Sequence, residues 1–146
     1  MPRIQVDVRN GDRPELDAFL GDRLYEFNST TTGIYDGELL NASVEDETGN
    51  IVAAMTGYTW GGCCEIVRVW VRRAMRGTGV GTALMEAAER EAVLRGCHQI
   101  VLSTHSFQAL RFYEDLGFHR LAAIPDYPRG HEKITYVKHL PPGSRA

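Results

Sequence analysis

A glycine-rich segment between an apolar strand and a helix is the feature that most constrains the fold. Residues 76–82 read Arg-Gly-Thr-Gly-Val-Gly-Thr. The β-branched and aromatic residues of 66–71 predict a buried strand before it, and residues 80–95 predict a helix that ends at Gly96. Helix-start N–H groups favour anions, and the guanidinium of Arg76 suits phosphate oxygens. The segment therefore predicts either a pyrophosphate-binding loop or a tight turn that needs glycine for its geometry alone.

The spacing of these glycines argues against two common nucleotide-binding loops. The pattern is G-x-G-x-G, whereas dinucleotide-binding folds use G-x-G-x-x-G. No Lys-Ser or Lys-Thr pair follows, so the lysine and the magnesium-binding hydroxyl of a P-loop are missing. A P-loop-like nucleotide-binding protein is therefore disfavoured.

Length and charge define the broad class of the protein. A chain of 146 residues is expected to form one domain over 1–146, with a frayed tail at 141–146. The formal net charge of −3 argues against nucleic acid or an anionic membrane as the partner. Neither a secretory segment nor an apolar run long enough to span a membrane is found, so a cytoplasmic location is expected.

The three cysteines, Cys63, Cys64 and Cys97, lack the spacing of metal ligands or of a redox motif. They are expected to be small buried or half-buried thiols in a reducing compartment. No metal site is expected.

Periodicity predicts the order β-α-β-β-β-α-β-α-β-β. Ile4, Val6 and Val8 alternate with polar residues and predict a strand over 3–9, and Pro14 opens a helix that continues to about residue 27. The further strands are expected at 38–45, 51–60, 66–71, 98–104, 118–124 and 133–139, with a helix at 106–116 and polar loops at 28–37 and 125–132. This order predicts an α/β fold with a mixed, mostly antiparallel sheet of about seven strands and helices on both faces, and a parallel strand pair around the glycine segment.

Two motifs at a fixed separation resemble those of the GNAT superfamily of N-acetyltransferases. The first is Val71 followed by Arg76-Gly77-x-Gly79-Val80-Gly81, which is similar to the family's acetyl-CoA signature. The second, about thirty residues later, is Ser-Phe-Gln-Ala-Leu-Arg-Phe-Tyr-Glu-Asp-Leu-Gly-Phe over 106–118. The resemblance covers nearly the whole chain. It implies a sheet splayed at the central parallel pair, acetyl-CoA as cosubstrate and, as in many relatives, a homodimer.

The resemblance also implies which residues bind the cofactor. The pyrophosphate would lie against Arg76 and the segment Gly77, Thr78, Gly79, Val80, Gly81 and Thr82. The strand residues Val69, Trp70 and Val71 would pair through their main chain with pantetheine. Ser106 occupies a position where the family often has asparagine, which leaves its hydroxyl either to cap the helix or to reach a pantetheine amide.

Acetyl transfer to an amine requires a base for the amine proton, a donor for the oxyanion and an acid for the leaving thiolate. The resemblance assigns the acid to Tyr113. Two residues compete for the base. Glu65 lies where some family members carry a catalytic glutamate, and even alternation would place it on the same face as Val71. His105 precedes the second motif's helix, and histidines titrate near neutral pH.

The acceptor is expected to be a primary amine of a small molecule or peptide. The polar loops supply the candidate acceptor-binding residues Tyr35, Asp36, Asp126 and His131. The acidic segment at 45–47 would suit a cationic amine, although a charged turn is normally just solvated. The alternative function is a catalytically silent acyl-CoA-binding sensor with the same fold.

Overall fold

The N-terminal unit of the chain contains a single helix. A computed structural model describes residues 2–142, and these divide into two compact units, 2–35 and 36–142. In the first unit, helix α1 (Pro14–Thr32) begins with proline in its first turn and ends at Gly33, whose φ is 74°. The predicted end at residue 27 is too early. The left-handed glycine ends the helix, while the polar residues before it remain helical.

The predicted strand at 3–9 is wrong, because residues 2–10 form neither helix nor strand. Ile4, Val6 and Val8 are all exposed. Alternation predicts a half-buried strand only where a neighbouring strand bonds to its main chain. Within residues 2–35 no second strand offers that partner.

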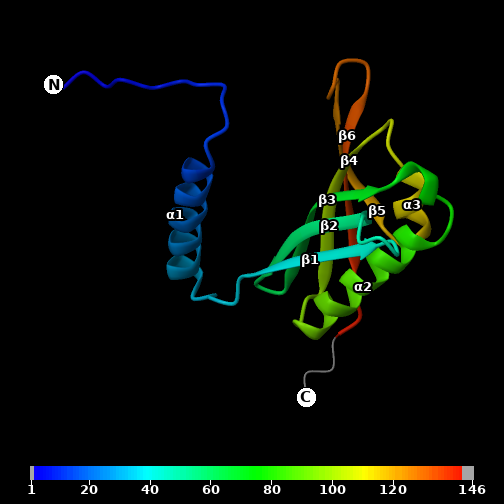
Figure 1. The fold of residues 1–146 in the computed structure, drawn as a ribbon. Helices are drawn as coiled ribbons and strands as arrows, with labels where there is room; N and C mark the ends of the chain where they lie inside the picture. The colour runs from blue at the N-terminus through cyan, green and yellow to red at the C-terminus, as the bar shows by residue number, and fades with distance from the viewer. Residues whose placement is uncertain (1, 143–146) are drawn as a thin grey trace. The chain divides into compact units, whose positions relative to one another are not determined.

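The second unit is built on one six-stranded sheet, in place of the seven strands expected (Figure 1). The strand order is β1-β2-β3-β4-β6-β5, and every neighbouring pair is antiparallel except the parallel pair β3–β4. The strands are β1 (Glu38–Glu45), β2 (Ile51–Trp60), β3 (Cys63–Val71), β4 (Gln99–His105), β5 (His119–Pro125) and β6 (Glu132–His139). Six of the seven strands predicted from the sequence are therefore present, within a few residues of the expected ends.

Helices α2 (Val80–Leu94) and α3 (Leu110–Asp115) pack on the same face of this sheet. They cover a core that contains Met55 and Ile66 from the sheet and Leu84 from α2. We call this side the helix face and the opposite side the far face. Helices were expected on both faces, but within residues 36–142 both lie on the helix face.

A β-bulge reverses the alternation of β3. Thr56 pairs with Arg68 and Gly57 pairs with Ile66, so Val67 is an extra residue. Before the bulge Ile66 points into the core, and after it Val69 and Val71 do so. The prediction that Glu65 and Val71 share a face is therefore wrong, because the inserted Val67 places Glu65 on the far face.

The bulge also coincides with the end of the parallel pairing. The pairs between β3 and β4 run from Cys63–Gln99 to Ile66–Leu102, and both strands continue beyond them. A bulged strand bends and twists more strongly than its neighbours. The sheet is therefore open between residues 67–71 of β3 and 103–105 of β4.

Helix α3 begins four residues later than predicted. Residues 106–109 form a turn, in which the side-chain oxygen of Gln108 accepts bonds from the Thr104 hydroxyl (2.7 Å) and the His105 N–H (2.8 Å). Ser106 bonds to the main chain of Glu132 on β6. These contacts hold the segment as an extension of the sheet, so it cannot form the first helical turn.

Other sequence expectations concern cysteines, metals and membranes. Cys64 and Cys97 are buried and Cys63 is half-buried, all as free thiols, which confirms their predicted burial. Burial raises the pKa of the Cys64 thiol to about 11.

Over residues 2–142, no cluster of three metal-ligating side chains is found. In the same range, no helix is long and apolar enough to cross a membrane. Residues 143–146 of the expected tail lie outside the described range.

Replacing Gly57 by alanine tests the bulge. An added Cβ would lie 2.2 Å from the main-chain oxygen of Glu65, so the two strands would have to move apart. We expect the free energy of unfolding, measured with urea, to fall by about 1–3 kcal/mol. Thr56→Ala, at the neighbouring exposed position, is the control and should change it by about 0.5 kcal/mol or less. Equal stabilities of the two variants would contradict this account of the bulge.

Candidate functional site

A groove of about 1540 Å³ lies where β3 and β4 separate. We call it the β3–β4 groove. Because the sheet is open there, side chains from both faces line the groove. From the helix face come Met55, Ile66, Val69, Val71, Leu102, Phe112 and Tyr113, and from the far face Thr56, Glu65, Arg68, Trp70, Ser103, His105 and Lys133. The glycine segment closes one end with Arg76, Gly77, Gly79, Gly81 and Thr82.

The glycine segment presents main-chain N–H groups to this groove. Gly77 and Gly79 have φ values of 76° and 89°, which side-chain-bearing residues rarely adopt. The first N–H of α2 with an intrahelical acceptor is that of Ala83, which donates to Gly79 O (3.0 Å). Within residues 2–142 the N–H groups of Gly77, Gly79 and 80–82 meet no acceptor. The segment is thus a tight turn that also leaves these N–H groups free, and anion binding by them stays a prediction.

The main chain of β3 also faces the groove. Arg72 N–H donates to Val52 O on β2 (2.7 Å). Bonding alternates along an antiparallel pair, so Trp70 points its main chain toward β2 while Val69 and Val71 point theirs toward the gap. The Nε of Arg76 donates to Val71 O (3.3 Å), in agreement with that direction. Two of the three strand residues predicted to bind the cofactor therefore expose main-chain groups, whereas the main chain of Trp70 is paired.

Tyr113 lies on α3, half-buried, with its ring in an aromatic cluster. Its ring contacts Phe112, Phe118 and Tyr136 at centroid distances of 5.2, 6.1 and 6.2 Å. Burial raises the pKa of the Tyr113 phenol above its ordinary value of 10. The hydroxyl makes no hydrogen bond within residues 2–142. Tyr113 is therefore a protonated donor beside the groove at neutral pH.

His105 occupies the end of β4 on the far face. Its Nδ1 lies 3.1 Å from the main-chain oxygen of Tyr127. A carbonyl oxygen only accepts, so Nδ1 carries the proton of this bond and Nε2 of the neutral ring keeps its lone pair. The ring stacks on Phe107 and Tyr127, at 5.3 and 5.6 Å. These contacts fix one tautomer and one orientation.

Glu65 also lines the groove, but its carboxylate already has a partner. The hydroxyl of Tyr58, which is its cross-strand neighbour on β2, donates to Glu65 Oε2. This bond, together with burial and the negative charge, raises the pKa of Tyr58 to about 12. The two candidate bases thus share the far face and differ in their partners.

Three predicted cofactor residues do not line the groove: Thr78, Val80 and Ser106. The Thr78 hydroxyl donates to the main-chain oxygen of Met75. The Ser106 hydroxyl accepts from Glu132 N–H (2.9 Å), and α3 has no side-chain cap. The helix-cap role considered for the Ser106 hydroxyl is therefore wrong, and the pantetheine contact stays a prediction.

Three of the four acceptor candidates belong to the second unit, and none of these three lines the groove. Asp36 accepts from Gly61 N–H (2.9 Å) at the turn between β2 and β3, and Asp126 accepts from Gly130 N–H (2.9 Å) within its own loop. The rings of His131 and Phe107 meet edge to face, with 5.0 Å between their centres. His131 therefore lies next to a residue that lines the groove. Tyr35 belongs to the N-terminal unit.

The acidic turn at 45–47 is held by hydrogen bonds of its own residue Asp46. Hydrogen bonds from Thr48 and Asn50, with the Arg72 charge nearby, lower the pKa of Asp46 to about 2. Its carboxylate is thus used within the hairpin turn.

Several lining residues were not predicted from the sequence, above all Arg68, Phe107 and Lys133. Lys133 enters the site because it pairs with His105 across β4 and β6. The sequence contains both strands but no signal for their register.

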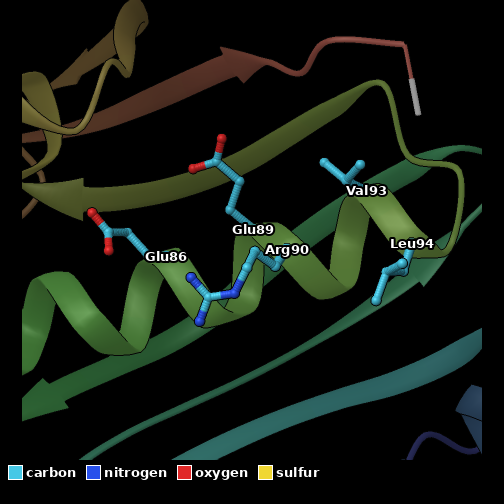
Figure 2. Close-up of a pocket in the computed structure, with 5 residues that line it drawn as sticks. All are labelled: Glu86, Glu89, Arg90, Val93 and Leu94. Atoms are coloured by element: carbon cyan, nitrogen blue, oxygen red, sulfur yellow. The ribbon is translucent and has the colours of Figure 1, made fainter. Parts of the chain in front are cut away.

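A second, smaller hollow of about 400 Å³ follows the exposed side of α2 (Figure 2). It is lined by Glu86, Glu89, Arg90, Val93 and Leu94, and Figure 2 shows that all five come from this one helix. Glu89 is paired with Lys138 Nζ at 2.8 Å. None of the residues predicted for the site lies there.

Comparison with known proteins agrees with the motifs. A profile described as the acetyltransferase (GNAT) family matches residues 8–118. An acetyltransferase of Agrobacterium fabrum is 29% identical over 85% of this chain and 90% of its own length. A blasticidin-S acetyltransferase of Streptomyces morookaense is 34% identical over 64% of this chain and 70% of its own.

Solved structures have the same fold. The crystal structure of a putative acetyltransferase from Agrobacterium tumefaciens superposes with a TM-score of 0.82 at 27% identity, covering 96% of this chain and all of the other. The profile match spans most of the chain, and the structural match spans nearly all of it. The chain therefore belongs to the acetyltransferase (GNAT) family, whose members are acyltransferases.

Proposed function

We propose that this protein transfers the acetyl group of acetyl-CoA to a primary amine of a small molecule or peptide by direct attack. The observation that carries the proposal is the β3–β4 groove. It combines unbonded glycine-segment N–H groups with main-chain groups of Val69 and Val71 that have no partner strand. Both sets of groups suit an extended ligand with a diphosphate at one end.

The residues present fit acetyl-CoA in charge and in shape. The N–H groups of Gly77, Gly79 and 80–82, with the Arg76 guanidinium, would hold the pyrophosphate. Space around Gly77 and Gly79 is open, since an added Cβ would meet nothing within 4 Å. The main chain of Val69 and Val71 would pair with the amides of pantetheine, and Val69 N–H would stabilise the oxyanion. When bound, acetyl-CoA supplies the activated thioester.

Tyr113 is the proposed general acid. Its raised pKa keeps the phenol protonated at neutral pH, so a proton is available for the departing thiolate. Because the pKa lies above 10, ionisation of Tyr113 should not limit turnover between about pH 6 and 9.

His105 is the proposed general base. Its Nε2 lone pair is available because Nδ1–H donates to Tyr127 O. It would take the amine proton directly or through one water. Glu65 is the rival, with one carboxylate oxygen occupied by Tyr58.

Release of CoA thiol from acetyl-CoA tests the function directly. The panel contains polyamines, aminoglycosides, amino acids and peptide N-termini, and we expect amine-dependent release with at least one class. The alternative, a silent acyl-CoA sensor, predicts acetyl-CoA binding without release on any acceptor. That result would reject the proposed activity while leaving the binding site intact.

Tyr113→Phe tests the general acid. The ring contacts are kept and only the hydroxyl is lost, so we expect kcat to fall by about 10²–10⁴-fold while acetyl-CoA affinity changes little. Phe112→Leu, which alters the same cluster without removing a proton donor, is the control for packing. Near wild-type turnover of Tyr113→Phe would exclude the acid role.

The pH profile of kcat/KM tests the base. We expect its acidic limb to survive in Glu65→Gln and to disappear in His105→Gln, with a large loss of rate at neutral pH in the latter. Circular dichroism and acetyl-CoA affinity establish that each variant is folded. If instead the limb disappears only in Glu65→Gln, the carboxylate is the base.

A further inference from the structure

We propose that the acceptor amine carries a carboxylate close to its amino group, and that Lys133 binds this carboxylate, with Arg68 as a second cation. The inference rests on the proposed function and deepens it, because it names the acceptor class. It would assign a specificity residue that neither motif contains.

The charges that line the β3–β4 groove do not suit a polycation. They comprise one carboxylate, on Glu65, against the side chains of Arg68, Arg76 and Lys133. Arg76 lies at the glycine segment, where the proposed pyrophosphate uses its charge. Arg68 and Lys133 are on the far face, together with the candidate bases. The acceptor end of the groove is therefore positively charged.

Lys133 has no acidic partner within residues 36–142. Its Nζ lies 5.0 Å from the centre of the Tyr127 ring, and the side chain is half-buried. Lys138, on the same strand, is by contrast paired with Glu89 at 2.8 Å. Arg68 likewise makes no ion pair in this unit. A half-buried, unneutralised ammonium at a groove wall is suited to an anionic ligand group.

The surrounding rings hold Lys133 in place. Tyr127, beneath its ammonium, stacks on His105, which stacks in turn on Phe107. The Tyr127 N–H donates to His131 O (3.0 Å), which closes the loop onto itself. Binding an anion at Lys133 would therefore require little ordering of the loop, which favours affinity.

The register sets the distance between the two acceptor groups. His105 and Lys133 are directly paired across β4 and β6 on the far face. Paired residues have Cβ atoms about 4.5–5.5 Å apart. The Lys133 ammonium and the His105 ring also contact the same Tyr127 ring, at 5.0 and 5.6 Å from its centre. An acceptor that meets both therefore has its carboxylate and its amine a few bonds apart. A free α-amino acid has that arrangement.

The test compares each of the common L-amino acids with its amide, in which the α-carboxylate is replaced by a neutral carboxamide, in the thiol-release assay. The amine of an amide is less basic, so more of it is neutral, and this bias works against the prediction. For the amino acid that the enzyme uses best, we expect kcat/KM to be at least about tenfold higher than for the amide of the same amino acid. Lys133→Gln should raise KM for the acid far more than for the amide and so remove this preference, and Lys133→Arg should largely keep it.

Arg111→Gln is the control for loss of a surface cation, because Arg111 is exposed on α3 and outside the groove. It should leave the preference unchanged. Amides used as well as acids, or release only with polyamines or aminoglycosides, would overturn the inference and leave the proposed function standing. An equal loss for acid and amide in Lys133→Gln would also overturn it. Absence of release with every amine would instead reject the proposed function.

Discussion

The structure depends on the separation of β3 and β4, which are hydrogen-bonded only as far as the Ile66–Leu102 pair. The bulge at Val67 bends β3 just after the Ile66–Leu102 pair, and Gly57 allows it because the Glu65 main chain passes where a Cβ would lie. An opened sheet normally leaves main-chain groups without partners, which is costly unless a ligand or water satisfies them. Here those groups face a groove that also receives the glycine-segment N–H groups, so the defect in the sheet and the candidate binding site are the same feature.

The opening also brings the two faces of the sheet into one site. Tyr113 approaches from the helix face, within the core cluster, while Glu65, His105 and Lys133 approach from the far face. The proposed acid, half-buried among aromatic rings, and the proposed base, in a more polar environment, can therefore act on one reacting centre. The proposed direct transfer uses both groups, because the attacking amine must lose a proton and the departing thiolate must gain one.

Local patterns predicted much of this fold, and they failed where a distant contact decides. The glycine segment, β1, β2 and α2 follow from composition, spacing and helix-end glycines. The strand expected at 3–9 had no partner in its unit, and Ser106 bonds to Glu132, far along the chain. The bulge at Val67 and the register that pairs His105 with Lys133 leave no local signature, so the face of Glu65 was predicted wrongly and Lys133 was missed.

The most direct test of this account is a titration of the isotope-labelled protein with acetyl-CoA, followed by backbone amide chemical shifts. The account predicts that the largest changes occur at Val69, Val71, Gly77, Gly79 and Gly81, on the two sides of the opened sheet. Residues 86–94, along the exposed side of α2, should change little. Saturable changes centred on α2, with the amides of β3 and the glycine segment unaffected, would contradict it.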